Sequence, residues 1–494
     1  MVKIFPPALL RNLTNGLKLL MLLFIGAMCW RAADKHIRYE PIIYDAAQNL
    51  TMAINFYNHG VFSLDASGSS VRPTAHRMPA YPFLLSFGML FSFNRGEVQP
   101  IDVMQTTKPS LQAGINQLKS VNKAVFVLLA GLTFLAGYVL TRSYAVSLAA
   151  CICLAQSRNL WENVNCFLTE GLTSLLLLGL SLGLAILLKA RHRAFAYAAA
   201  GVLLAALALS NAVYFYFFPP ALLLLWLEAR SAGLTPLQML RRISVFALAF
   251  ALLTGAWMAR NQYHFGRFYL TERGGGVLSG RAVYDTMTMS EYLASFLYWT
   301  PNDTAQRLLT RYFSPEDYRN IDREHENGYR ARIIAREKEL LKQTGSQVET
   351  DKLLVAEGWQ ALRKHFFKHL ATTVPFAYRG IFVSPRLYLW NDIYLLKGTY
   401  VCYLLFLSLF MLTLHSLRAR DAVLLAFLAP SLFSYAFFSF FTHNIARYNT
   451  PLLPVLWIAA SIVLHRYIFR HMPGAAGRLY RYCRAAVRTK PEHG

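Results

Sequence analysis

The run Leu168-Thr-Glu-Gly-Leu-Thr-Ser-Leu-Leu-Leu-Leu-Gly-Leu-Ser-Leu-Gly-Leu-Ala-Ile-Leu-Leu188, followed by Lys189-Ala-Arg-His-Arg193, decides the fold class of this chain. A helix needs about 20 mostly apolar residues to cross the hydrocarbon core of a bilayer, and this run is long enough. The basic residues after it fit a cytoplasmic connection, where Lys and Arg are enriched. The stretch therefore predicts a membrane-spanning helix whose amino end lies outside.

Comparable apolar runs occur along the rest of the chain. They centre near residues 17–33, 122–141, 144–160, 168–188, 194–210, 212–228, 243–259, 397–416, 421–440 and 450–469. If the amino terminus is cytoplasmic, alternation places all the strongly basic short connections on the cytoplasmic side. These connections are Arg142, 189–193, 229–242, 417–420 and the tail from Arg466. We expect an all-α, multi-pass protein of the cytoplasmic (inner) membrane with about ten transmembrane helices and both termini in the cytoplasm.

Composition supports this class and excludes others. The 494 residues are 55% hydrophobic and 15% charged, and the formal net charge is +24. The basic residues are dispersed and no nucleic-acid-binding motif occurs, so no nucleic-acid partner is expected. The six cysteines have neither metal-ligand spacing nor the pattern of a disulfide framework. No clear metal site is visible, which leaves a divalent metal cofactor open.

Alternation also predicts the domain organisation. Residues 1–259 form an N-terminal transmembrane region with a first outer loop at 34–121, and 158–167 is a short outer turn. Residues 260–396 form a mostly helical extracytoplasmic domain, with helices at 330–341 and 351–370. Residues 397–494 form a C-terminal transmembrane region and a basic tail. In the first loop, 79–93 is too short to cross and predicts an interfacial or re-entrant helix. Residues 94–121 then form a polar excursion.

Asp45 lies in a predicted interfacial helix over 41–59. Pro41 is a good first helical residue and Gly60 a good stop. Apolar residues recur at steps of three and four, which gives a buried stripe, whereas Asp45 falls on the polar side with three other side chains. The stripe is Ile43, Ala46, Ala47, Leu50, Ala53, Ile54 and Tyr57, and the polar group is Asp45, Gln48, Asn49 and Asn55. Such a helix would hold a carboxylate at headgroup depth, although a solvated surface acid gives the same pattern.

Other polar residues gather at the outer ends of predicted spans, and each has an alternative explanation. Arg77 suits a lipid phosphate or ordinary headgroup anchoring. Glu170 is a functional candidate as an acid beside a membrane segment, or it stabilises the positive end of a helix. Arg260 could hold a phosphate or pair with an acid. His443 and Arg447 share a helical face beside Tyr448, although a lone histidine there is usually structural.

No metal box, nucleophile elbow, P-loop or dinucleotide fingerprint occurs. Three glycines at 274–276 allow a close backbone approach but are weak evidence of phosphate binding. One acid with several arginines at an outer surface fits transfer from a lipid-phosphate donor. Phosphate is then the leaving group, arginines stabilise its charge, and the carboxylate takes a proton from the incoming hydroxyl.

Five short motifs follow one another along the chain. They are Asp45-x3-Asn49-x3-Ala53-x2-Phe56 with Gly60-Val-Phe62; Arg77-Met-Pro79-Ala-Tyr81-Pro82; Thr169-Glu170; Trp257-Met-Ala-Arg260-Asn261-Gln-Tyr-His-Phe265-Gly266; and Arg447-Tyr448-x2-Pro451-x2-Pro454. In this order they resemble the GT-C superfamily of membrane glycosyltransferases, in particular its aminoarabinose-transferase and protein O-mannosyltransferase-like branch. The resemblance covers nearly the whole membrane part.

The chain departs from the family pattern at several positions. Asn49 replaces the commoner Tyr, Ala256 stands where Pro often precedes Trp257, and Ser210-Asn211 replaces an Arg-Pro. Ala46 follows Asp45 where true protein mannosyltransferases have Glu. This last difference argues against protein O-mannosylation and leaves the acceptor open.

The resemblance implies a sugar donor on a polyprenyl phosphate and transfer with inversion at the extracytoplasmic side of the bilayer. Asp45 would be the general base, and Arg77, Arg260 and Arg447 would bind the donor phosphate. Four further residues would support them: Glu170, His443, Tyr448 and Tyr81. The acceptor would be a glycan, a glycolipid or a protein.

Two other functions are compatible with the sequence. A secondary transporter or flippase of lipid-linked sugars would usually place its polar groups near the middle of the membrane on broken helices of repeated halves. Here the ionisable residues gather at the ends of spans and the two halves differ. A non-catalytic scaffold with 260–396 as a partner-binding domain would make Asp45 and Arg447 dispensable.

Overall fold

The computed structural model describes residues 42, 44–66, 71–104, 109–157, 160, 165–189, 194–322, 325–383 and 398–469, together with the isolated positions 23, 26, 27 and 30. The first predicted span, 17–33, therefore lies largely outside the described residues. The same holds for Pro41 and Ile43, for most of the turn at 158–167, for Arg191 and Arg193, and for the basic tail beyond residue 469.

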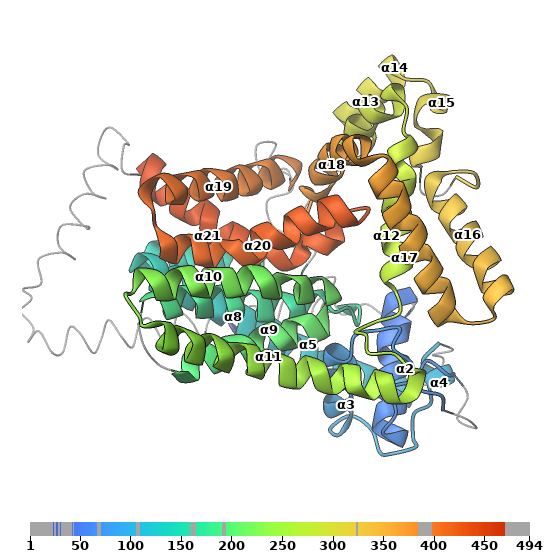
Figure 1. Ribbon diagram of the computed structural model, residues 1–494, viewed down its shortest axis with the longest axis horizontal. Coiled ribbons are helices and arrows are strands. Elements are labelled where there is room, and N and C mark those ends of the chain that lie inside the picture. The colour runs from blue at the N-terminus through green and yellow to red at the C-terminus, as the bar shows by residue number, and fades with distance from the viewer. Residues whose placement is uncertain are drawn as a thin grey trace, which may run out of the picture.

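All regular elements in the described ranges are helices, and seven are long and apolar enough to cross a membrane. They lie side by side as one bundle (Figure 1). The seven are α5 (Pro109–Thr141), α8 (Glu170–Lys189), η1 (Ala212–Phe217) continued by α10 (Phe218–Ser231), α11 (Pro236–Phe265), α19 (Gly398–Ala419), α20 (Ala422–Phe441), and η5 (Ala446–Leu452) continued by α21 (Leu453–Val463) and η6 (Leu464–Phe469). The prediction of an all-α multi-pass membrane protein is confirmed, whereas the number of about ten spans is not.

Two other predicted spans form shorter helices inside the bundle. These are α6 (Tyr144–Ala155) and α9 (Ala194–Ser210). The 12 residues of α6 cover about 18 Å, which is less than the hydrocarbon thickness, so α6 cannot cross unaided. α6 packs on α5 and α21, and α9 packs on α8 and α11. Both helices contribute buried residues to the main apolar core of the bundle.

A second apolar core holds the first outer loop against the bundle. It joins α2 (Tyr44–His59), α3 (Ala80–Met89) and the start of α5, and it includes the predicted stripe residues Ala46, Leu50, Ala53, Ile54 and Tyr57. α2 is buried on more than this stripe. Asn49 and Asn55 were expected on the polar side, but both are buried and donate hydrogen bonds to backbone carbonyls, Asn49 to Phe167 O and Asn55 to Ser63 O.

The prediction of a polar excursion over 94–121 is wrong in its second half. α4 (Pro100–Met104) lies in this segment, and residues 109–121 form the first turns of α5. Leu111, Ile115 and Leu118 recur at steps of four and three, and all three are buried in the core with α2 and α3. This apolar period extends the helix beyond the membrane segment.

Seven short helices cover one end of the bundle (Figure 1). They are α12 (Gly274–Ala282), α13 (Met289–Tyr298), α14 (Asp303–Tyr312), α15 (Pro315–Tyr318), α16 (Tyr329–Thr344), α17 (Gln347–Lys364) and α18 (Phe366–Gly380). The predicted single helix over 351–370 is wrong, because the chain leaves helical geometry at His365 (φ −120°, ψ 30°) between α17 and α18. The domain limits at 260 and 396 remain a prediction.

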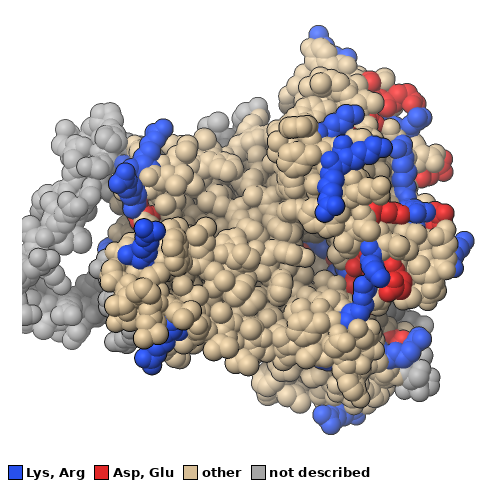
Figure 2. All heavy atoms as spheres, in the orientation of Figure 1, with Lys and Arg blue, Asp and Glu red and all other residues tan. Residues whose placement is uncertain are grey.

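Charged side chains are sparse over the middle of the bundle on the face shown in Figure 2. Figure 2 shows Lys, Arg, Asp and Glu over its two ends, with few between them on this face. Such an uncharged middle is what a hydrocarbon layer requires of the helices that cross it. The candidate site lies at one end of the bundle. α2 and the helices α12–α18 lie at that same end (Figure 1).

Candidate active site

Asp45 occupies the first turn of α2. The residue before it, Tyr44, has a left-handed backbone (φ 51°) and is highly exposed, whereas Ala46 after it is buried. The Asp45 side chain is about one quarter exposed, at 25%. The carboxylate is therefore accessible but largely surrounded by protein.

Two arginines from distant parts of the chain form ion pairs with Asp45. Arg77, in the segment before α3, contacts Oδ1, and Arg447, in η5, contacts Oδ2. Arg447 lies 402 residues from Asp45 in the sequence. Because each guanidinium contacts a different oxygen, the carboxylate is fixed between two cations. Such charge-assisted bonds define orientation as well as adding energy.

Gln48 and Glu170 complete this group. Gln48 lies three residues after Asp45, on the same face of α2, and its Oε1 accepts a hydrogen bond of 2.7 Å from Arg77 Nε. Glu170 is the first residue of α8 and its Oε1 lies 2.9 Å from Arg447 Nε. Its side chain is only 9% exposed, and Oε2 makes no hydrogen bond to any described residue. Glu170 therefore begins a helix and also contacts Arg447.

The charge state of the site follows from these contacts. Burial alone would raise the pKa of Asp45, but the positive charges of Arg77 and Arg447 and their hydrogen bonds lower it to about 2. Asp45 is therefore ionised throughout the physiological range. Burial, with Arg273 and Arg77 nearby, lowers the pKa of His76 to about 4, so its ring is neutral at pH 7.

Arg273 is a neighbour of the site that sequence reasoning did not single out. Thr271 Oγ1 donates to Ala75 O (3.1 Å) and Glu272 Oε1 accepts from Thr74 Oγ1 (3.3 Å), so this segment lies along the one that carries Arg77. The positive charge of Arg273 contributes to lowering the pKa of Arg77. The one available signal was its position beside the glycine run.

Arg260 lies apart from the Asp45 group. Its guanidinium donates to Thr74 O (2.8 Å) and Phe62 O (3.5 Å) and stacks over the Trp257 ring, 4.8 Å from its centroid. Within the described ranges, no hydrogen bond or ion pair joins it to Asp45. Arg260 instead supports the loop that presents Arg77. It also lines a pocket of about 380 Å³ formed mainly by aromatic and apolar residues.

Of the remaining candidates, some adjoin the Asp45 group and others contact different parts of the protein. Tyr448 follows Arg447, and its hydroxyl lies 3.2 Å from His443 Nε2, so both residues adjoin the site. Tyr81 is buried, and its hydroxyl donates to Asn122 Oδ1 at 2.9 Å. The glycine run begins α12, where Asp351 Oδ1 accepts from Gly275 N at 2.7 Å. A carboxylate thus already occupies the backbone donor that a phosphate would need.

The described residues contain no group of three His, Cys, Asp or Glu side chains placed to hold a metal ion. No protein-family model matches the chain, and no curated protein sequence matches it.

Two solved structures illustrate what the fold is similar to. One is the oligosaccharyltransferase AglB from Archaeoglobus fulgidus in complex with an inhibitory peptide and a dolichol-phosphate, with 12% identity and a TM-score of 0.48, covering 97% of this chain and 53% of that one. The other is ArnT from Cupriavidus metallidurans bound to undecaprenyl phosphate, with 12% identity and a TM-score of 0.37, covering 92% of this chain and 81% of that one. The chain spans about half the length of AglB. Similarity at this level assigns no activity.

Proposed function

We propose that this protein is an integral membrane glycosyltransferase. It moves a sugar from a polyprenyl-phosphate donor to an acceptor hydroxyl on the extracytoplasmic side of the inner membrane, with inversion at the anomeric carbon. The acceptor is a glycan, a glycolipid or a protein of the cell envelope.

A single observation carries this proposal: one partly exposed carboxylate is fixed between two arginines brought together from opposite ends of the chain. A lipid phosphate has the charge and geometry that paired guanidinium groups bind. A carboxylate beside it is placed to act on a hydroxyl that approaches the donor.

The reaction balances with these groups alone. Asp45 accepts the proton of the acceptor hydroxyl as its oxygen bonds to the anomeric carbon. The bond from that carbon to the phosphate oxygen breaks, and the lipid phosphate leaves with the electron pair. Arg77 and Arg447 stabilise the negative charge that develops on it. Attack from the face opposite the leaving group inverts the anomeric configuration.

The low pKa of Asp45 suits a reaction in which the donor binds before Asp45 accepts the proton. A carboxylate with a pKa of about 2 is a weak base while both arginines face it. A donor phosphate bound by the same arginines offsets their charge and so raises the pKa of Asp45. Asp45 therefore becomes a better base when the donor is in place. Glu170 holds Arg447 from the other side, and Arg260 remains a phosphate candidate through the pocket that it lines.

Asp45→Asn tests the assignment. The amide keeps the shape of the side chain but cannot accept the proton, so we expect transfer to fall by about 10²-fold or more. Transfer is measured in membranes supplied with lipid-linked sugar, and the thermal unfolding of the purified protein checks that it is folded. Asp65→Asn is the matched control, because Asp65 lies in the same loop and also pairs with an arginine, Arg72.

The outcomes separate the competing functions. Full transfer activity in the Asp45→Asn protein would refute the role of Asp45. Movement of lipid-linked sugar across vesicles without any glycosylated product would instead identify a transporter or flippase.

A further inference from the structure

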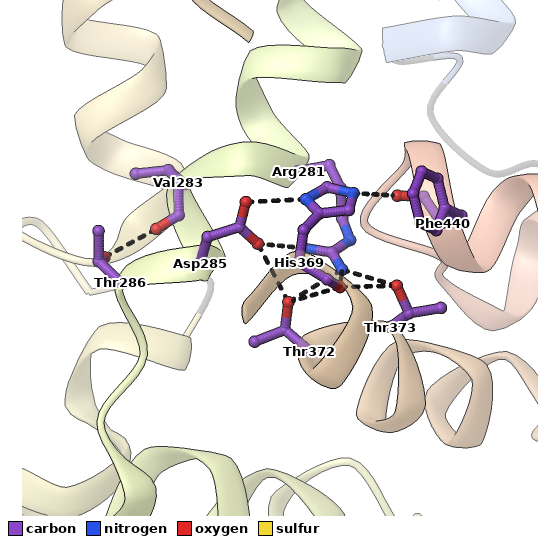
Figure 3. Close-up of polar contacts among 8 residues, drawn as sticks. All are labelled: Arg281, Val283, Asp285, Thr286, His369, Thr372, Thr373 and Phe440. Carbon is purple, nitrogen blue, oxygen red and sulfur yellow. Dashed lines mark hydrogen bonds and ion pairs between the residues drawn. The ribbon is translucent and has the colours of Figure 1, made fainter. Parts of the chain in front are cut away.

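α18 has an unusual distribution of polar and apolar residues. Its inward face carries His369 and Thr372, which join a fully buried polar network (Figure 3). His369 Nδ1 lies 2.8 Å from Asp285 Oδ2, and Nε2 lies 2.8 Å from Phe440 O at the end of α20. Arg281 donates to Asp285 Oδ1 at 3.1 Å. His369 and Thr372 are therefore directed into the protein.

The outward face of α18 is apolar. Phe367 is 82% exposed, and Leu370 and Val374 are about half exposed, at 50% and 52%. These residues follow one another at steps of three and four, so they form a continuous stripe. The arrangement is opposite to that of a helix facing water, and exposed aromatic side chains in such a stripe mark an interaction surface.

The position of this stripe identifies the apolar medium that it faces. α18 packs on α20, a membrane-spanning helix, and Trp359 of α17 contacts Phe441, the last residue of α20, with ring centroids 6.1 Å apart. Trp is enriched where a membrane helix leaves the hydrocarbon. α18 and the end of α17 therefore lie beside the end of a membrane-spanning helix.

Three cations border the stripe. Arg363 and Lys364 end α17, Lys368 lies in the first turn of α18, and all three are exposed. None of them forms an ion pair with a described residue. Arg363 and Lys364 also line a groove with Trp359. Figure 2 shows Lys and Arg side chains gathered over α17 and α18. Cations at the edge of an apolar surface suit a layer whose outer boundary carries phosphate groups.

We infer that α18 and the end of α17 form a binding surface for anionic phospholipids. Phe367, Leu370 and Val374 lie against the acyl chains, Arg363, Lys364 and Lys368 bind the headgroup phosphates, and Trp359 lies at the boundary between them. This surface is separate from the Asp45 site and does not depend on the function proposed for it.

Quenching of Trp359 by brominated lipids tests this inference. The full-length protein is placed in nanodiscs that contain brominated phosphatidylglycerol or brominated phosphatidylcholine, and the Trp359 signal is obtained as the difference from Trp359→Phe. We expect the anionic lipid to quench Trp359 roughly twofold more than the zwitterionic one. The triple variant Arg363→Gln, Lys364→Gln, Lys368→Gln should quench equally with both lipids.

A charge-matched control keeps the result specific. Arg307→Gln, Lys338→Gln, Lys342→Gln removes three exposed cations from α14 and α16 and should retain the preference for the anionic lipid. Absence of quenching by either lipid would overturn the inference and show that water, another protein or a second copy covers this face. Equal quenching in the unmodified protein would show lipid contact without headgroup recognition and would also overturn it.

Discussion

At the scale of single residues, the site depends on the balance between burial and charge at Asp45. Burial disfavours its ionised form, yet the two arginines reverse that effect and bring its pKa to about 2. The pKa of Asp45 is lower in the folded protein than in the unfolded chain. At a pH above the ordinary aspartate pKa near 4, ionised Asp45 therefore stabilises the fold. That contribution is lost as the pH falls from about 4 toward 2.

Arg77→Gln should therefore change the pH dependence of transfer. Burial raises the pKa of Asp45 and the two arginines lower it. Removing one guanidinium therefore leaves a higher pKa. We expect the activity that remains to fall on acidification at a higher pH than in the unmodified protein, within the range from about 4 to 6. The measurement is the rate of transfer across pH 4–8 in membrane vesicles.

Two variants control this experiment. Arg77→Lys keeps a positive charge and should restore most of the original profile, although it loses the hydrogen bond to Gln48. Arg72→Gln removes a guanidinium from the outer loop at a site where the arginine is 83% exposed, and it should leave the profile unchanged. A profile for Arg77→Gln that superimposes on the original would show that Asp45 does not titrate in the reaction.

At the scale of elements, α18 supports the segment that carries Arg447. Asn444 donates to Phe376 O (3.0 Å), Asn449 donates to Gly380 O (3.2 Å), and the two amides bond to each other (2.6 Å). Both asparagines are fully buried. Asn444 can approach α18 this closely only at a glycine, because a Cβ at Gly380 would lie 2.3 Å from Asn444 Nδ2. This close contact fixes the chain between α20 and η5.

Gly380→Ala should displace that segment. The added methyl group cannot be accommodated without moving the buried amides, so we expect a loss of about 1–3 kcal/mol of stability together with lower transfer activity. Thermal unfolding and transfer are measured side by side. Gly255→Ala is the control, because nothing lies within 4 Å of its Cβ position, and it should be neutral or slightly stabilising. Equal effects of the two substitutions would contradict this account.

At the scale of the whole molecule, one buried network joins the helices at the end of the bundle to the bundle itself. Arg281, Asp285 and His369 come from α12, η2 (Val283–Thr286) and α18, and His369 reaches Phe440 O in α20 (Figure 3). The two ring nitrogens of His369 thus contact a carboxylate and a backbone carbonyl. Asp285 also forms the buried ion pair with Arg281.

Asp285→Asn should weaken the whole assembly. It leaves the buried charge of Arg281 without its anion, and breaking a buried pair in this way costs about 3–5 kcal/mol. We expect a lower unfolding temperature and faster amide exchange in α12 and α18, measured by hydrogen–deuterium exchange. Asp303→Asn, at the exposed start of α14, should change neither. Unchanged exchange in α12 and α18 of the Asp285→Asn protein would show that the network does not hold these helices.

Some of the site was accessible to sequence reasoning and some was not. Asp45, Arg77, Glu170 and Arg447 were selected because they lie where apolar runs begin or end, and the structure brings these four together. Arg260 was selected on the same grounds but bonds to Thr74 O, and Tyr81, selected from the family resemblance, bonds to Asn122. Gln48 was predicted on the correct face of its helix but was given no role. Arg273 was marked only by its position beside the glycine run.

The amino-acid sequence by itself determined the class of the protein: helices that cross a membrane, with their ionisable residues at the ends. Hydrophobic runs specify this locally, since about 20 apolar residues must satisfy their own backbone hydrogen bonds wherever they lie in a bilayer. Only the tertiary structure decided which helix ends meet. Contacts such as Asp45 with Arg447, or His369 with Phe440, depend on the packing of segments far apart in the chain, and no local period encodes that packing.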